Sequence, residues 1–127
     1  MVAMFEDTVI DTGLGDTIDT LATYIWICST EPVNLASAAT SALLGYKSLA
    51  AGGHFNAPTA STSPTGRKVV SNAISDGTIT TSGTASWWAV GTTAALYAHG
   101  TLSAAQAVAA GNTFSLAAFE LKIANQA

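Results

Sequence analysis

Residues 66 to 91 read GRKVVSNAISDGTITTSGTASWWAVG, and this stretch decides the fold class. Its β-branched and aromatic residues gather in short runs, and residues that favour turns separate the runs. Asp76-Gly77 predicts a tight turn, because glycine adopts the backbone angles that hairpin turns need. The stretch therefore predicts several short strands in succession, which is typical of an antiparallel all-β protein.

The segment NTFSLAAFELKIAN, residues 112 to 125, predicts the last long strand. Its large apolar residues form two groups of opposite parity, Phe114 with Leu116 and then Phe119, Leu121 and Ile123. A slip of one residue moves every side chain of a strand to the other face. We therefore expect a β-bulge at Ala117-Ala118, which brings both groups to one core. Glu120 and Lys122 then point to solvent or to a partner.

Two runs, Tyr24–Cys28 and Trp87–Val90, are apolar at every position. Such a strand is covered on both of its faces. In one small antiparallel domain, a second sheet covers one face, and the N-terminal segment, a loop or a neighbouring subunit covers the other. Neighbouring residues of a strand point to opposite faces, so Trp87 and Trp88 cannot enter the same core.

Trp88 is the expected core residue of the pair, because it shares its parity with Val90. Trp87 then lies on the opposite face, where aromatic side chains often anchor interfaces. Trp87, Tyr24 and Trp26 are therefore the candidate intersubunit contact. Stacking of a sugar on the tryptophan pair is the weaker alternative, since both residues sit in a strand with the pattern of burial.

Residues 35 to 66 are rich in Gly, Ser, Thr and Pro and predict a region of long loops. Within it, LASAATSALL (residues 35 to 44) is an alternative short helix, because Ala and Leu favour helices. LSAAQAVAAG (residues 102 to 111) presents the same choice and is interpreted as extended, because predicted strands flank it on both sides.

The chain of 127 residues is long enough for one domain. We expect an all-β antiparallel sandwich or flattened barrel of about seven or eight strands. Residues 1–20 form an irregular acidic N-terminal arm, and residues 21–127 form the β-rich body with its long loop region.

The charge of the chain is low and unevenly placed. Charged residues make up 9% of the sequence, whereas Ala, Ser and Thr account for 55 of the 127 residues. Five of the eight acids lie in the first 19 residues: Glu6, Asp7, Asp11, Asp16 and Asp19. Four basic residues are too few for the field that binds nucleic acid, and no apolar run approaches the length of a membrane helix. The acidic segment is a solvated face or, less favoured, a docking strand for a basic groove.

The segment VIDTGLG, with Asp11, is similar to the catalytic strand of a retropepsin-like aspartic protease. Only ten residues precede Asp11, although that family places a pair of strands before its triad. The apolar-apolar-Gly segments that should pack behind the loop, Leu43-Leu44-Gly45 and Ala89-Val90-Gly91, do not fit the family order. The aspartic protease therefore remains a distant alternative.

No other set of residues indicates catalysis or a cofactor. His54 and His99 have no second His or Cys at the spacing of metal ligands. Cys28, the single cysteine, lies in an apolar run, where it is expected to be a buried hydrophobic residue. We expect a protein that is not an enzyme, with no metal and no cofactor.

Five segments are together similar to small structural proteins of tailed bacteriophages: Cys28-Ser29-Thr30-Glu31-Pro32, Gly66-Arg67-Lys68, Gly83-Thr84-Ala85 before Trp88-Ala89-Val90, Leu96 to Leu102, and Gly111-Asn112-Thr113-Phe114. They are turns and strand alternations, spread over about 80% of the chain. Within this group, the chain most resembles the capsid decoration, or cement, proteins.

The resemblance implies a virion protein that assembles in the bacterial cytoplasm. It implies self-association into a homo-oligomer, such as a trimer, and contact with the major capsid protein, which the decoration protein locks in place. The low basic charge and the lack of a long apolar run, in turn, predict no binding of nucleic acid or membrane. A tail, connector or fibre module that contacts other virion parts or the host surface is the alternative.

Overall fold

The computed structural model describes residues 13, 14, 18, 20–49, 52–62 and 65–124. In this part of the chain, nine strands and one short π-helix follow in this order: β1 Tyr24–Cys28, η2 Ser37–Ser41, β2 Leu43–Ser48, β3 Thr59–Thr62, β4 Thr65–Val70, β5 Ile74–Ile79, β6 Gly83–Gly91, β7 Leu96–Val108, β8 Thr113–Leu116 and β9 Glu120–Ala124. The expected all-β class is confirmed.

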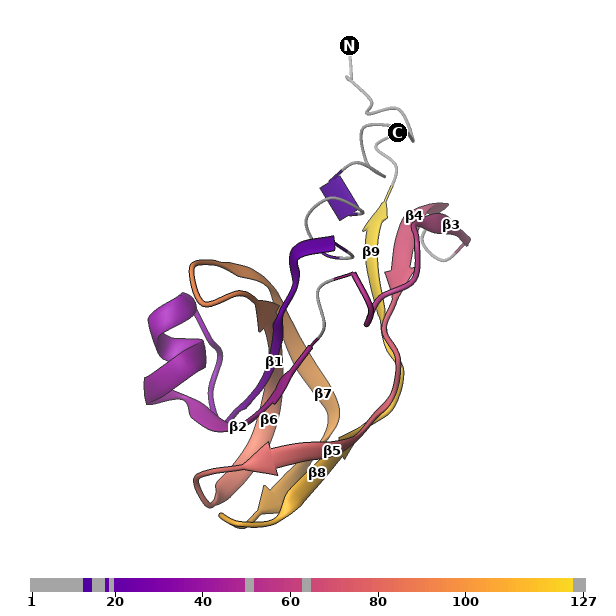
Figure 1. The fold of residues 1–127 in the computed structure, drawn as a ribbon. Coiled ribbons are helices and arrows are strands. Elements are labelled where there is room, and N and C mark those ends of the chain that lie inside the picture. The colour runs from indigo at the N-terminus through magenta and orange to yellow at the C-terminus, as the bar shows by residue number, and fades with distance from the viewer. Residues whose placement is uncertain (1–12, 15–17, 19, 50–51, 63–64, 125–127) are drawn as a thin grey trace.

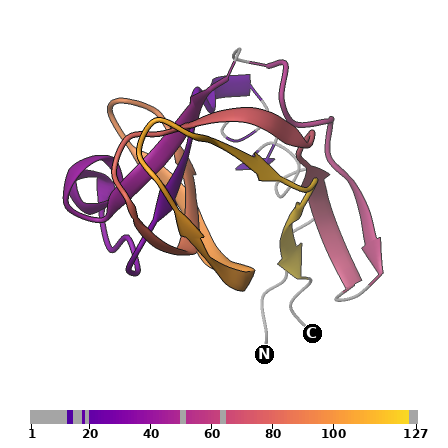
Figure 2. The same ribbon diagram turned by 90° about the horizontal axis from the view of Figure 1, so that it is seen from below.

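The strands form two antiparallel sheets. Six of them lie in the order β7-β6-β1-β2-β5-β8 and curl into a half-barrel, and β3, β4 and β9 form a smaller sheet beside it (Figure 1). Figure 2 shows the curl of the larger sheet from below. Residues 102–108, which were interpreted as extended, belong to β7.

The main core lies on the concave side of the half-barrel. Ile25 and Ile27 of β1 point into it, together with Val90 of β6 and Ile79 of β5. Val69 of β4 belongs to the same cluster, so the smaller sheet closes one side of the core. The remaining buried members of the main core are Leu14, Ile18, Ala22, Leu44, Phe55, Ile74, Ala85 and Phe114.

The segment expected as an acidic arm contributes to this core. Leu14 and Ile18 are 5% and 7% exposed and pack in the main cluster. The five acids of the segment lie outside the described residues.

The region expected as long loops contains two strands and the helix. β2 pairs with β1 and β5 in the centre of the large sheet, and β3 pairs with β4. The helical alternative for residues 35–44 is confirmed in part, since η2 occupies Ser37–Ser41. Gly45 allows β2 to pair closely with β5, because a side chain at position 45 would overlap the Thr78 carbonyl oxygen of β5.

The turn expected at Asp76-Gly77 is wrong, because both residues belong to strand β5. Gly77 pairs with Phe114 of β8, and the Phe114 ring occupies the place of a side chain at position 77. The pairing shifts register between Ile74 and Gly77. Glycine therefore leaves room here for an aromatic ring that packs over the strand. The local sequence does not distinguish this role of glycine from its role in a turn.

The bulge expected at Ala117-Ala118 is also wrong, because the strand ends there and a new one begins. β8 pairs with β5 in the large sheet, whereas β9 pairs with β4 in the small one. Residues 117–119 carry the chain from one sheet to the other, and this crossing reverses the parity of the inward side chains.

The expected burial around this crossing holds in part. Phe114 is buried, Leu116, Phe119 and Leu121 are half-buried, and the side chain of Ile123 lies outside the described residues. Glu120 and Lys122 are exposed as expected. Glu120 accepts hydrogen bonds from Lys68 on β4 at 2.8 Å and forms an ion pair with Lys122 at 3.1 Å, and these bonds lower the pKa of its carboxyl group.

We expect Gly77→Val to destabilise the protein by about 1–3 kcal/mol, because the new side chain must displace the Phe114 ring in a packed core. Ser75→Ala, at an exposed position of the same strand, is the control and should change the stability by less than about 0.5 kcal/mol. Urea unfolding monitored by tryptophan fluorescence measures both. Equal urea midpoints for the two variants would contradict the packing of the Phe114 ring against Gly77.

Candidate interaction surface

The convex, outer face of the half-barrel carries aromatic side chains from three adjacent strands. Trp26 of β1 pairs with Tyr46 of β2 on one side and Ala89 of β6 on the other. Tyr24 stacks on Trp26 with ring centroids 5.7 Å apart, and its ring lies 6.3 Å from that of Tyr46. Trp87 shares the face of Ala89, because the two are two residues apart on β6. We call Tyr24, Trp26, Tyr46 and Trp87 the aromatic strip.

A short segment, residues 34–42, covers the middle of this face, and we call it the cover. Its start is fixed by the Ser37 amide, which donates to Asn34 Oδ1 at 2.9 Å. At its end, the Ala42 carbonyl accepts from the Ser29 amide at 3.0 Å. Ala38 is fully buried against Trp26 and its neighbours, because a methyl group lets η2 approach the sheet closely.

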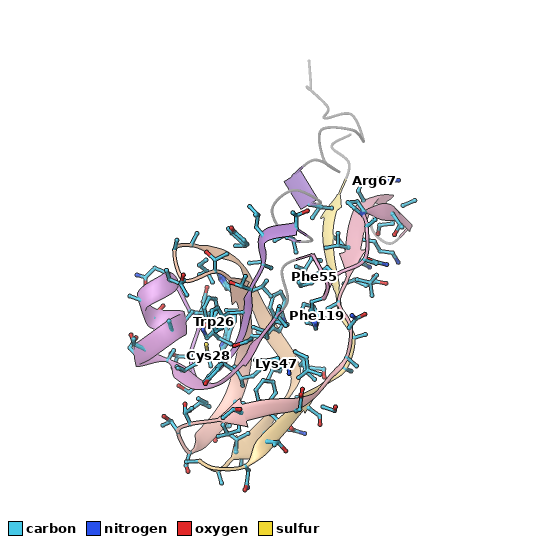
Figure 3. The ribbon with its side chains drawn as sticks, viewed as in Figure 1. Trp26, Cys28, Lys47, Phe55, Arg67 and Phe119 are labelled. Carbon is cyan, nitrogen blue, oxygen red and sulfur yellow. The ribbon has the colours of Figure 1, made fainter. Side chains whose placement is uncertain are left out.

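The cover explains why β1 is apolar on both parities. Trp26 and Cys28 lie under it in a second core, and the residues between them point into the main core. Figure 3 shows Trp26 and Cys28 on the side of β1 toward η2, and Phe55 and Phe119 on the other side. A loop segment of the same chain is therefore what covers the second face of β1.

The three residues of the candidate intersubunit contact differ in exposure. Trp26 is 5% exposed, so it supports the surface from below. Tyr24 and Trp87 are half-buried and keep part of their rings accessible. Tyr46, which sequence reasoning missed, is 36% exposed and belongs to the same rim. Tyr46 could have been found only as the residue that pairs with Trp26, and this pairing is known only once the register of β2 against β1 is known.

Beside the strip lies a shallow hollow with a largely apolar lining. Its volume is about 390 Å³, and its lining residues are Tyr24, Trp26, Leu35, Ala36, Ala39 and Thr93. Two elements far apart in sequence, the cover and the turn after β6, form its walls. The hollow adjoins the strip at Tyr24 and offers a place where an apolar side chain of a partner can pack.

A polar pair borders the strip at Trp87. The His99 ring of β7 lies 6.1 Å from the Trp87 ring, and His99 Nε2 lies 3.4 Å from Glu31 Oε1. Glu31 lies three residues after the end of β1. The surface thus joins an apolar body to a hydrogen-bonding edge, as interfaces commonly do.

Trp88 points to the opposite side, as expected. It packs against the main core, with its ring 4.8 Å from that of Phe119. Gly100 of β7 lies directly across from Trp88, and a side chain at position 100 would come within 2.8 Å of the indole. The ring therefore lies over the bare backbone of the neighbouring strand.

The titratable groups of the described residues give little basis for catalysis. Burial raises the pKa of the Cys28 thiol to about 11, so the thiolate that a nucleophile needs is scarce at neutral pH. His54 is 9% exposed, and its Nε2 has no hydrogen-bond partner among the described residues. Burial and then the charge of Lys47 lower the pKa of His54 below its ordinary 6.5. Asp11 lies outside the described residues.

The described ranges contain no group of three or more side chains placed to hold a metal ion. Within the same ranges, no helix has the length and apolar character needed to cross a bilayer. Comparison of the chain with protein-family models, with curated proteins and with solved structures gives no match. The function must therefore be inferred from the fold and the aromatic strip.

The two neighbouring tryptophans should respond differently to truncation. We expect Trp88→Ala to cost about 3 kcal/mol or more of unfolding free energy, because it leaves a void against Phe119 and the main core. Trp87→Ala should cost less, about 1–2 kcal/mol, because Trp87 packs only against the smaller second core, most of whose members are alanines. Urea midpoints of the two variants measure this difference, and the reverse order would show that the faces are misassigned.

Stability should decline as the pH falls below 6.5, because of His54. Its pKa is lower in the folded protein, so the unfolded chain takes up the proton first. The decline should end once the pH has passed through the folded pKa, where both states are protonated. Urea midpoints at about pH 7.5, 6.5 and 5.5 should fall less in His54→Gln than in the unchanged protein. Equal slopes would contradict the prediction.

Proposed function

We propose that this protein is a capsid decoration protein of a tailed bacteriophage, which binds the outside of the head and locks neighbouring major capsid subunits. The observation that carries the proposal is the aromatic strip: three partly exposed rings on a rigid sheet, next to an apolar hollow. Aromatic residues anchored in a rigid scaffold supply much of the binding energy of protein interfaces.

The composition supports a partner that is a protein. The charged fraction of 9% leaves little basis for contacts through ion pairs, and the net charge of −4 does not favour a polyanion. Hydroxyl-bearing and alanine side chains make up much of the surface instead. A surface of this kind suits close packing against neighbouring subunits in a coat.

The partners that follow are the major capsid protein and further copies of the same chain. Trp87 is the proposed anchor, since it combines partial exposure with support from the second core. The pair of His99 and Glu31 beside it can exchange hydrogen bonds with a backbone at the edge of the contact. Tyr24 and Tyr46 extend the contact along the strip.

The place in the virion can be tested by counting copies of the protein in purified particles of the phage that encodes it. A decoration protein should be present in hundreds of copies, one or more for each few capsid subunits. A dozen copies or fewer would instead assign the protein to the tail, the connector or a fibre. Absence from purified particles would overturn both roles.

We expect Trp87→Ala to weaken binding to heads that lack the protein by about tenfold or more, the loss typical of an aromatic anchor. Leu21→Ala, which removes an apolar side chain that is 49% exposed outside the strip, is the control and should bind normally. Co-sedimentation with heads measures binding, and melting curves verify that both variants are folded. Normal binding of the Trp87 variant would rule out the aromatic strip as the contact.

A further inference from the structure

The half-barrel is open between β7 and β8. These strands follow each other in the chain and are joined by the short turn at Ala109–Asn112, in which the Asn112 amide donates to the Ala109 carbonyl at 3.1 Å. They nevertheless lie at the two ends of the sheet order, since β7 pairs with β6 and β8 pairs with β5. We call the opening between them the seam.

One part of β7 has no paired residues in the register with β6. The pairing with β6 passes from Ala85↔Gln106 directly to Trp87↔Thr101, so four residues of β7, 102–105, stand opposite a single residue of β6. β7 is also the last strand in the sheet order, so among the described residues no strand of the large sheet pairs with its outer edge. An extended edge with free N–H and C=O groups is a template for another strand.

The seam leads into a hollow of about 430 Å³. Its floor is apolar and consists of Ile27, Trp88, Phe114 and Phe119. A second hollow of about 520 Å³ continues from it toward the turn, between residues 106–109 and 112–115. All side chains that line the two hollows are uncharged.

The wall of the seam on β7 has small side chains where a core strand would have large ones. Ala104 and Gln106 line the hollow and are exposed, although Leu102 and Val108 on the same face are half-buried. A strand inserted here would find backbone groups on the β7 edge and an apolar floor for its alternate side chains. Recognition of this kind selects an extended, uncharged, apolar peptide.

The sequence contains such a peptide outside the described residues. Residues 1–5 read MVAMF, which is uncharged and apolar throughout, and Glu6 and Asp7 follow at once. The chain enters the described structure at Gly13, beside Leu96–His99 at the first end of β7. The seam opens toward the other end of the same strand, away from the place where the molecule's own N-terminal segment joins the described residues.

We propose that residues Met1–Phe5 of a second copy add to the β7 edge in the seam, so that copies of this chain join by strand exchange. The acids that follow then stay outside the uncharged hollow. Pairing between strands sets the geometry of the contact, and the apolar floor supplies burial. The proposed function already includes contact between copies of the chain; the contact through the seam is separate from the aromatic strip and holds or fails without the role in a virion.

The direct test is photo-crosslinking of the full chain with benzoylphenylalanine in place of Phe5. Equal amounts of ¹⁴N- and ¹⁵N-labelled protein are mixed, irradiated and digested, and the crosslinked peptides are identified by mass spectrometry. We expect crosslinks to residues 102–106 or 113–119 that join a light chain to a heavy chain. Crosslinks to these residues only within one isotope would show that the segment folds back on its own chain, and crosslinks elsewhere would remove the seam as the site. Either result overturns the proposal.

A matched pair of variants tests the seam itself. Ala104 and Ala105 are both exposed neighbours on β7, but Ala104 lines the hollow and Ala105 does not. Ala104→Glu places a charge in the seam and should lower the yield of crosslinks between chains at least tenfold, whereas Ala105→Glu should keep it. Melting curves verify that both variants fold. Equal yields would overturn the proposal, while head binding of the unchanged protein, measured separately, tests the virion role.

Discussion

The burial of β1 on both of its faces is the constraint on which the rest of the structure depends. Ile25 and Ile27 must be covered on one side, and Trp26 and Cys28 on the other. Burying a tryptophan alone removes about 200 Å² from water, worth roughly 5 kcal/mol as an upper bound. The half-barrel curls around the first pair, and the cover folds over the second. The aromatic strip exists because the cover shields Trp26 and leaves the rings around it partly open.

The parts of the fold that the sequence predicts are those that depend on local pattern. Two-sided apolar runs correctly indicated strands covered on both faces, and the opposite directions of Trp87 and Trp88 follow from strand geometry. The apolar groups on either side of Ala117-Ala118 correctly indicated a reversal of parity. A bulge and a change of sheet produce the same reversal, so the sequence pattern could not distinguish them.

The parts that the sequence does not predict depend on contacts between distant residues. Asp76-Gly77 has the composition of a turn, but Phe114, far along the chain, needs a position without a side chain at residue 77. β2 lies in a stretch with the composition of loops and becomes a central strand because β1 and β5 pair with it on either side. Tyr46 and the hollow beside Tyr24 could not be assigned for the same reason, since both depend on that register.

The buried thiol of Cys28 also makes the cover observable. Its Sγ lies 3.8 Å from the Ala38 carbonyl, and its pKa of about 11 keeps it protonated and unreactive while the cover is closed. Thiol reagents can therefore modify the native protein only in moments when η2 lifts from the sheet or the molecule unfolds. Because the chain has a single cysteine, the rate at which a thiol reagent labels Cys28 reports how often the cover opens from the sheet. Any partner that binds the aromatic strip and holds the cover closed should lower the labelling rate of Cys28, even if it makes no contact with the sulfur.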